Sequence, residues 1–456
     1  MNAVNEGGLE WLSAVEAAAA IREGRLTSRD YTEACLDAIA RQEDTVGAWT
    51  FLDRDYALAQ ADAADEAHRL GRPHGPLHGL PIGVKDIFDT RDMPTEDGSP
   101  LHAGRTPRDD AATVARLRAA GGLVMGKTVT TEFATYHPGK TANPHDPRRT
   151  PGGSSSGSAA AVACGMVPLA IGSQTNGSTI RPASFCGVVG YKPSFGAIPR
   201  NGALKLSRAL DHVGLFARDV PDVALLAECL FGCDAEDPDT RPQAVPPLLR
   251  AALSEPPTAP RLAFVPGPVW ELAESETQEA FGELIEALNE ADAEAGIGKI
   301  EQFDLSEGFS EAQALHAVVM ETDLACNLAR EYRDGADRIS PVLRAMIERG
   351  LNQHGAYDYA RALAMMPALN EALEEAFFNF DAFITPAAAG PAPFGLEATG
   401  SPAFCSLWTF CGLPAITLPL LRSADGMPLG VQLIGQRGAD AKLLRTAQWL
   451  MTRDFT

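Results

Sequence analysis

The first seventy residues carry the spacing of apolar positions that is typical of amphipathic helices. Ser13 and Glu16 have the capping-box spacing ahead of an alanine-rich run, which predicts a helix start. The same periodicity predicts a second helix that begins at Ser28 and a third over about 53–70. We therefore expect N-terminal helices over residues 1–72.

From residue 75 onward the pattern changes to short β-branched runs that are separated by glycine and proline. Helical patterns at 111–120 and 156–164 lie between these runs, and such alternation indicates an α/β sheet. Four runs have the length and apolar character of buried strands: Leu80–Val84, Leu123–Gly126, Val167–Ser173 and Gly187–Tyr191.

The second half of the chain is mainly helical before strands return near the end. Residues 233–260 are acidic and proline-rich, and we expect them to form a surface excursion. Three helices are predicted next, over Glu274–Ala295, Glu311–Glu331 and Tyr357–Phe378. The final pattern predicts strands at Ala382–Thr385, Ala415–Leu418 and Gly430–Ile434, and a helix at Ala441–Leu450.

Strands on both sides of the helical stretch favour one sheet that the C-terminal residues complete. A length of 456 residues allows two or three domains, but this pattern favours a single one. It would comprise the N-terminal helices, a core at 75–232, a mainly helical insertion at 261–380 and closing elements at 381–456. The absence of a fixed-period sequence repeat excludes solenoids and propellers.

Composition and charge narrow the range of partners. Hydrophobic residues make up 45% of the chain, which is enough for a large core. Asp and Glu number 60 against 38 Lys and Arg, which gives a net charge of −22. Such a surface is soluble and repels phosphate backbones and anionic lipids, so we expect no nucleic-acid or membrane partner.

The cysteines and the first residues favour a cytoplasmic protein. Met1–Gly8 lacks the basic and apolar regions of a signal peptide, and no run reaches about 18 apolar residues. The eight cysteines are dispersed, and Cys229 and Cys233 have no partner pair or nearby histidine that would complete a zinc site. We therefore expect reduced thiols and no metal.

Two clusters of serine and glycine, Thr150–Ser158 and Gly172–Pro182, are the candidates for chemistry. Both place hydroxyls beside backbone that a ligand can approach closely. Neither is followed by the lysine of a phosphate-binding loop. Residues 153–157 match the G-x-S-x-G pattern of a nucleophile elbow, but a loop leads into them where an elbow needs a strand. The later histidines lie in helix-like or turn settings: His212, His316 and His354.

A third interpretation is a serine hydrolase with a lysine as the base. The apolar stretch Gly79–Val84 ends in Lys85 and Asp86, which would place one lysine at the end of a buried strand. Burial lowers the pKa of an amine and frees its lone pair at neutral pH. A Lys–Asp step after a strand is more often an exposed pair, but the serine–glycine clusters favour the catalytic interpretation.

These segments resemble the amidase signature family. The resemblance rests on Gly79–Asp86, Pro151–Val162, Gly177–Ser178 and Cys186–Ser194, and weaker similarity extends it over about residues 10–450. It implies the α/β amidase signature fold, in which one large mixed β-sheet is covered by helices on both faces.

The resemblance also implies a Ser–cisSer–Lys triad. Lys85 matches the base, Ser154 the serine on a cis peptide bond and Ser178 the nucleophile, and the spacing of the two serines equals that of the family. The backbone N–H groups of Thr175, Asn176 and Gly177 would form the oxyanion hole. No cofactor or metal is implied.

Three positions depart from the commonest family pattern. Asn176 stands where glycine is usual. Asparagine tolerates the left-handed conformation, so the turn could survive the change, but the side chain could enter the pocket. Gln174 stands where aspartate is frequent. Arg181 follows the nucleophile at the third position, where many members have arginine at the second. In this respect the chain is more similar to malonamidase-like amidases than to the tRNA-dependent amidotransferase subunit.

The candidate substrate-binding residues are Arg181, Ser173, Gln174 and Ser155. In the malonamidase-like branch the arginine binds a substrate carboxylate, so Arg181 with Ser173 could bind an acidic acyl group; the alternative is structural hydrogen bonding under the turn. For Ser155 we favour a hydroxyl in the supporting network. Met365 and Met366 could line a substrate funnel, although core packing is the stronger interpretation. We expect the region from about 303 to 380 to build the pocket.

The resemblance therefore implies an amidohydrolase that cleaves small amides, anilides, carbamates or urea-like compounds through an acyl-enzyme. The alternative is the glutaminase-like component of a tRNA-dependent amidotransferase, which would need partner subunits. A catalytically silent scaffold is disfavoured by the complete set of Lys85, Ser154 and Ser178. Relatives often form homodimers, so a homodimer is possible.

Overall fold

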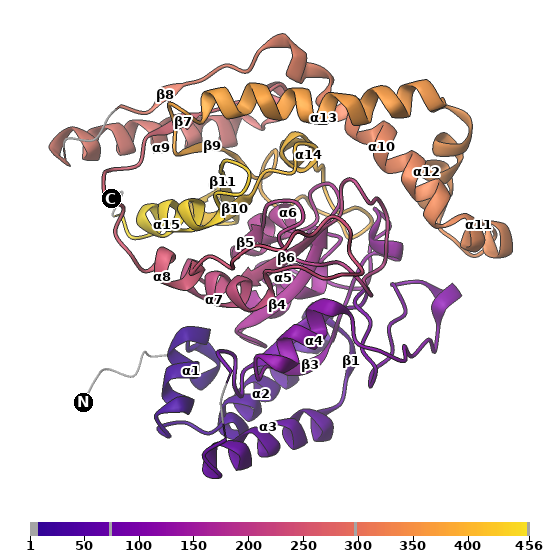
Figure 1. Ribbon diagram of the computed structural model, residues 1–456, viewed down its shortest axis with the longest axis vertical. Helices are drawn as coiled ribbons and strands as arrows, with labels where there is room; N and C mark the ends of the chain where they lie inside the picture. Colours follow the sequence, from indigo (N-terminus) through magenta and orange to yellow (C-terminus); the bar gives the residue numbers. More distant parts are fainter. Residues whose placement is uncertain (1–7, 73–74, 296–298, 454–456) are drawn as a thin grey trace.

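One mixed sheet of eleven strands forms the centre of the computed structural model, which describes residues 8–72, 75–295 and 299–453 (Figure 1). The strand order across the sheet is β1-β3-β2-β4-β6-β5-β10-β11-β9-β7-β8. The mixed α/β sheet confirms the predicted fold class. The expectation for Met1–Gly8 concerns residues that lie, apart from Gly8, outside the described part of the chain.

The N-terminal helices lie at one end of the molecule in Figure 1. Ser13 accepts from the backbone N–H of Glu16, whose side chain accepts from Ser13 N, so the predicted capping box is present. Helix α2 ends at Gly47 in the left-handed conformation, which glycine adopts without strain. The elements are α1 (Ala14–Arg22), α2 (Ser28–Val46), β1 (Trp49–Leu52) and α3 (Arg54–Arg69). The pattern does not reveal strand β1, because it is short and lies at the sheet edge.

The core of the sheet contains the predicted apolar strands. β2 (Pro81–Lys85) is parallel to both β3 (Leu123–Thr128) and β4 (Leu169–Gln174), and every residue of β2 and β3 is buried, as in a parallel sheet covered on both faces. β6 (His212–Ala217) pairs antiparallel with β4 and with β5 (Val189–Lys192). The accompanying helices are α4 (Ala112–Ala119), α5 (Ser156–Ala163), α6 (Ile180–Cys186) and α7 (Val220–Leu230).

The helical insertion differs from the prediction in several elements. Residues 233–260 include α8 (Leu248–Ala252), whose Leu248 is buried, so this segment is more than a surface excursion. The helix expected over 311–331 is divided into α10 and α11, and the pattern does not reveal α12 or two short strands. The elements are β7 (Leu262–Phe264), α9 (Ser275–Ala295), β8 (Glu301–Gln302), α10 (Ala312–Asn327), α11 (Ala329–Gly335), α12 (Pro341–Asn352) and α13 (Ala356–Ala376).

The C-terminal strands enter the same sheet, as the pattern predicts. β10 pairs antiparallel with β5 and with β11, and β11 pairs antiparallel with β9. These elements are β9 (Ala382–Pro386), α14 (Ala403–Phe410), β10 (Ala415–Arg422), β11 (Pro428–Ile434) and α15 (Asp440–Met451). Short 3₁₀ segments occur at Leu9–Trp11, Pro100–His102, Glu132–Ala134, Trp270–Leu272 and Glu307–Glu311.

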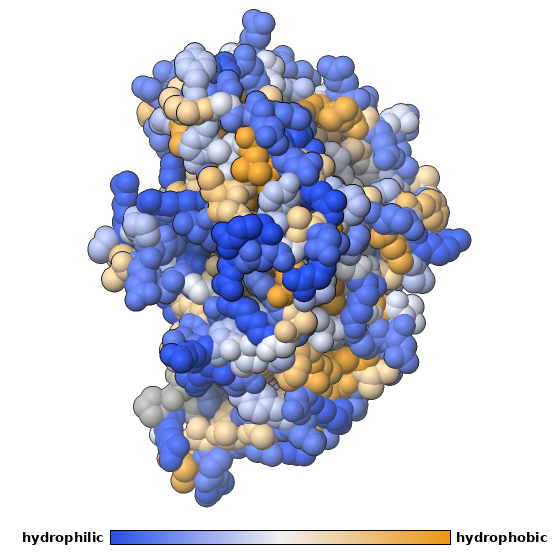
Figure 2. All heavy atoms as spheres, turned by 90° about the vertical axis from the view of Figure 1, so that its right-hand side faces the viewer, coloured by the Kyte–Doolittle hydropathy of each residue, from blue (hydrophilic) through white to orange (hydrophobic). Residues whose placement is uncertain are grey.

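On the face shown in Figure 2 hydrophilic residues dominate, and apolar residues form scattered patches. In the described residues no helix combines the length and the apolar character that crossing a membrane requires. All eight cysteines are free, and five of them are buried.

Candidate active site

Lys85 ends β2 with a side chain that is 0% exposed. Its Nζ donates to Ser154 Oγ at 2.7 Å and to Ser173 Oγ at 2.8 Å. Burial lowers the pKa of Lys85 well below its ordinary value of 10.5, and the charge of Asp211 only partly opposes this shift. The lowered pKa favours the neutral amine, which is the form that a general base requires.

Ser154 follows a cis peptide bond to Gly153, in a loop that leads into α5. This loop packs closely against its neighbours. A Cβ at Gly153 would lie 2.8 Å from Thr399 Cγ2, and Gly152 has a φ of +80° and lies against the backbone of Pro182. The glycines thus allow the loop to bring Ser154 to Lys85.

Gln174 supports the turn between β4 and α6. Its Oε1 accepts from Thr179 N at 2.8 Å and from Ile180 N at 3.0 Å, and its Nε2 donates to Thr409 Oγ1 at 2.9 Å. The side chain is 0% exposed. Gln174 therefore binds free N–H groups at the start of α6, and both polar atoms of its amide have partners within the protein.

Asn176 does not need the left-handed conformation that asparagine tolerates, since in the described non-glycine residues a positive φ occurs at Asp97, Phe133 and Ala134. Its Nδ2 donates to Tyr136 Oη at 3.0 Å, and its Oδ1 accepts from Ser406 Oγ at 2.7 Å. These partners fix the side chain, so it does not enter a pocket freely. In the described part of the chain, the N–H groups of Asn176 and Gly177 have no hydrogen-bond acceptor.

Ser178 lies next to this turn and is 8% exposed. Its carbonyl accepts from Ser155 N at 3.4 Å. Ser155 Oγ accepts from Ser173 N and donates to Ser173 O, both at 3.2 Å, which places Ser155 in the supporting network. Within the described residues, no hydrogen bond joins Ser154 to Ser178.

Arg181 is 1% exposed beneath the turn. Its Nη2 donates to Gly153 O at 2.7 Å and to Thr399 Oγ1 at 3.1 Å. Its Nε and Nη1 have no partner in the described residues, and burial lowers its pKa. The hydrogen bond to Gly153 O agrees with a structural role of Arg181 under the turn. The Nε and Nη1 donors remain available for a substrate carboxylate.

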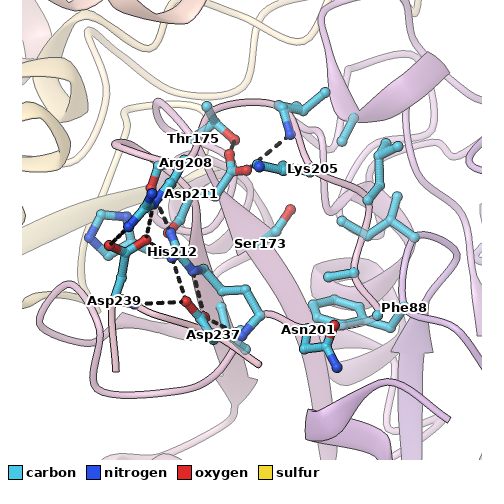
Figure 3. Close-up of a pocket in the computed structure, with 18 of the residues that line it drawn as sticks. Phe88, Ser173, Thr175, Asn201, Lys205, Arg208, Asp211, His212, Asp237 and Asp239 are labelled. Atoms are coloured by element: carbon cyan, nitrogen blue, oxygen red, sulfur yellow. Dashed lines mark hydrogen bonds and ion pairs between the residues drawn. The ribbon is translucent and has the colours of Figure 1, made fainter. Parts of the chain in front are cut away.

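A cavity of about 300 Å³ reaches Ser173 and Thr175 (Figure 3). In Figure 3 the Ser173 hydroxyl points into the space between Thr175, Asn201 and Phe88. All lining residues come from residues 87–239, and Lys85, Ser154 and Ser178 are not among them, so this cavity does not test the expectation for 303–380. A second cavity of about 410 Å³ includes Met366 among its lining residues.

Two ion pairs at the first cavity were not predicted from the sequence. Arg200 Nη2 contacts Asp237 at 2.9 Å, and Arg208 Nε contacts Asp239 at 3.0 Å. The only sequence signal is the acidic stretch after Cys233, which the pattern assigns to the surface. In the described ranges, no group of three or more His, Cys, Asp or Glu residues could hold a metal ion.

The histidines occupy more specific positions than the sequence suggests. His212 begins β6, where its Nδ1 contacts Leu210 O at 2.6 Å. His316, on α10, contacts Thr175 O through Nε2 at 2.8 Å. His354 Nε2 contacts Glu321 at 2.8 Å. The contact of His316 could not be predicted, because 141 residues separate the two partners.

Comparisons with known proteins agree with this fold. The profile of the family described as Amidase matches residues 30–444. In Streptomyces coelicolor, the glutamyl-tRNA(Gln) amidotransferase has an A subunit that is 33% identical, over 95% of this chain and 94% of its own length. Putative amidase AmiD of Mycobacterium bovis is 33% identical, over 97% of this chain and 94% of that protein.

A solved structure shows the same similarity in three dimensions. It is described as an unexpected vestigial protein complex that reveals the evolutionary origins of an s-triazine catabolic enzyme. Its TM-score is 0.87 at 29% identity, over 96% of this chain and 98% of that chain. Sequence and fold therefore agree over nearly the whole length, and the chain belongs to the amidase signature family.

Proposed function

We propose that this amidohydrolase cleaves the C–N bond of small amide, anilide, carbamate or urea-like substrates with Ser178 as nucleophile. Lys85 is the base, and Ser154 passes the proton between them. The observation that carries the proposal is the buried Lys85 amine at 2.7 Å from Ser154 Oγ. A lysine with a lowered pKa beside a hydroxyl is the arrangement that a serine–lysine hydrolase needs.

The proposed reaction begins when neutral Lys85 takes a proton from Ser154, which takes one from Ser178. Ser178 Oγ attacks the substrate carbonyl, and the N–H groups of Thr175, Asn176 and Gly177 stabilise the negative oxygen. Each such donor is worth about 2.7–4 kcal/mol of the barrier. The proton then returns to the leaving nitrogen, and water hydrolyses the acyl-enzyme. The relay requires the hydroxyls of Ser154 and Ser178 to approach each other when substrate binds.

For Arg181 we favour the structural role, because its hydrogen bond to Gly153 O supports the peptide that precedes Ser154. Its two unpartnered donors keep carboxylate binding as the alternative. Removing the carboxylate from an otherwise matched amide would distinguish them. If Arg181 is structural, KM stays the same; if it binds the carboxylate, KM rises at least tenfold.

The second candidate is a glutaminase-like component of a tRNA-dependent amidotransferase, which the 33% identity to such a protein supports. Gln174, Asn176 and the position of Arg181 argue against it. Hydrolysis of glutamine that appears only with partner subunits would favour this candidate. A small-molecule enzyme is instead expected to act alone or as a homodimer.

The free cysteines support a cytoplasmic location.

The experiment compares the wild type with Ser178→Ala on a panel of amides, p-nitroanilides, carbamates and ureas. We expect wild-type hydrolysis of at least one class and no hydrolysis by the variant, with unchanged circular dichroism. Lys85→Ala is expected to lose nearly all activity. Full activity of the Ser178 variant would contradict the assignment of the nucleophile.

A further inference from the structure

Helix α10 of the helical insertion contacts the turn that carries the proposed oxyanion donors. His316 Nε2 lies 2.8 Å from Thr175 O. His316 is 1% exposed, and burial lowers its pKa to about 4, so the imidazole is neutral at pH 7. A carbonyl oxygen can only accept a hydrogen bond. The neutral His316 ring therefore has its hydrogen on Nε2, and this N–H donates a hydrogen bond to Thr175 O.

The Thr175 carbonyl belongs to the same peptide group as the N–H of Asn176. In a trans peptide the two bonds lie in one plane and point in opposite directions. In the described part of the chain the cis bond is the one between Gly153 and Ser154, so the 175–176 peptide is trans. His316 therefore fixes the direction of the Asn176 N–H by holding the carbonyl on the other side of the peptide group.

The next peptide group is held in the same way from a different helix. Thr409 Oγ1, on α14, donates to Asn176 O at 2.6 Å. This carbonyl shares its peptide group with the N–H of Gly177. Thr409 is 0% exposed, and its Oγ1 also accepts from Gln174 at 2.9 Å, which fixes the hydroxyl. Two consecutive N–H groups are thus oriented through their carbonyls.

A hydrogen-bonded ring ties α10 to Thr175 a second time. Thr175 Oγ1 donates to Asp211 Oδ1 at 2.6 Å, and Asp211 Oδ2 accepts from Ser207 N at 3.0 Å. Ser207 Oγ in turn donates to Asp323 Oδ2 at 2.5 Å. Asp323 follows His316 by seven residues, which is about two turns, so both lie on one face of α10. The turn therefore cannot rotate without breaking contacts on both sides of Thr175.

We propose that His316 and Thr409 are positioning residues that preorganise the oxyanion hole by holding the carbonyls of the peptide groups whose N–H groups bind the oxyanion. The inference rests on the proposed function. Preorganised donors lower the barrier because they need not reorient as charge develops in the transition state. The effect therefore belongs to kcat, since the substrate carbonyl in the ground state gains less from these donors.

The test compares His316→Phe, which keeps a ring but removes the donor, with His316→Gln, which retains an N–H. We expect His316→Phe to lower kcat by 10- to 100-fold with KM changed less than twofold. His316→Gln should recover at least half of that loss on a logarithmic scale. Gln313→Ala, at an exposed position of the same helix, is the matched control and should leave kcat unchanged.

The Thr409→Val and Thr409→Ser pair repeats the test on the second peptide group. Thr409→Val should lower kcat about tenfold, and Thr409→Ser should retain most of it. If His316→Phe does not fold, the Thr409 pair alone tests whether the held carbonyls preorganise the oxyanion hole. Wild-type kcat in His316→Phe or in Thr409→Val, or equal losses in both members of a pair, would overturn the inference. Activity in Ser178→Ala would instead contradict the proposed function, so the two failures are distinguishable.

Discussion

Lys85 shows how folding changes the chemistry of a single side chain. The amine contacts two serine hydroxyls and no carboxylate, so burial determines its pKa. Lys127 provides the contrast within the same sheet. It is also fully buried, but it lies 3.2 Å from the Asp86 carboxylate. Of these two lysines, the one without a carboxylate in contact is suited to act as a base.

The lowered pKa of Lys85 predicts the pH dependence of activity. Protonated Lys85 cannot accept a proton, so kcat/KM should be low in acid and should rise with pH as the amine becomes neutral. Because the pKa lies well below 10.5, the rise should be complete before strongly alkaline pH. A kcat/KM profile from pH 5 to 10 measures this. A kcat/KM that is still low at pH 9 and still rises steeply at pH 10 would contradict the role of Lys85, and Lys85→Arg should be inactive throughout.

The residues of the triad could be identified from the sequence because each lies in a distinctive local motif. Their supporting contacts could not. Thr409 meets Asn176 across 233 residues, and neither position has a local pattern that marks the contact. The sequence suggests that the side chains of Gln174 and Asn176 face the substrate, because their neighbours in the sequence are catalytic candidates. Their side-chain directions depend on Thr409, Ser406 and Tyr136, which the chain brings together by folding.

At the scale of elements, close packing places the Ser154 loop. Helix α5 approaches the residue before β1 and the residue after β3 so closely that a Cβ at Gly157 would lie 2.2 Å from Ala48 O and 2.4 Å from Val129 N. Gly157 N also donates to Val129 O at 3.0 Å. Both obstacles are backbone atoms, which cannot move away as a flexible side chain can. This glycine therefore sets the distance between α5 and the sheet.

Gly157→Ala should lower the free energy of unfolding by roughly 1–3 kcal/mol, because overpacking displaces α5. The matched control is Gly282→Ala in α9, where a Cβ meets nothing within 4 Å. That change should stabilise the protein by about 0.5–1 kcal/mol, because alanine loses less entropy in a helix. Urea denaturation measures both changes. Equal stabilities of the two variants would contradict this account of α5.

Elements with a strong local sequence pattern were predicted correctly. The errors in the predicted secondary structure occur where the local pattern is weak. β2 and β3 are apolar runs bounded by turn residues, so their pattern is independent of the rest of the fold. β8 has two exposed residues and is a strand only because β7 pairs with it. His212 follows a loop and resembles a turn residue in sequence, but pairing with Gln174 makes it the first residue of β6.

At the scale of the molecule, residues far apart in sequence share one sheet. β5 lies between β6 and β10, so the strands of the C-terminal region continue directly from those of the core. The N-terminal helices and α9 and α13 lie at opposite ends of this sheet (Figure 1). We propose on this basis that the chain is a single domain. The core, the insertion and the closing elements are then stretches of sequence within that domain and not separate folding units.

A single domain should unfold cooperatively. Trp49 in β1 and Trp408 in α14 are both buried and lie in distant parts of the sequence. Tryptophan fluorescence and far-ultraviolet circular dichroism should therefore give coincident urea transitions. In a variant that retains only Trp49, and in one that retains only Trp408, the fluorescence midpoint should equal the circular dichroism midpoint of the same variant. Separated midpoints within one variant would show that the N-terminal and C-terminal parts unfold independently.

The central claim is that Ser178 is the nucleophile and that Lys85 activates it. A fluorophosphonate forms a stable covalent bond with an activated serine, so mass spectrometry of the digested adduct locates the nucleophile directly. No Lys or Arg lies between Arg149 and Arg181, so Ser178 shares one tryptic peptide with the other candidate serines, and the fragmentation spectrum of that peptide must locate the adduct. We expect one adduct per chain, on Ser178 itself, and its formation should be strongly slowed in Lys85→Ala. An adduct on Ser154, Ser155 or Ser173, or labelling of Ser178 at the wild-type rate without Lys85, would contradict the account.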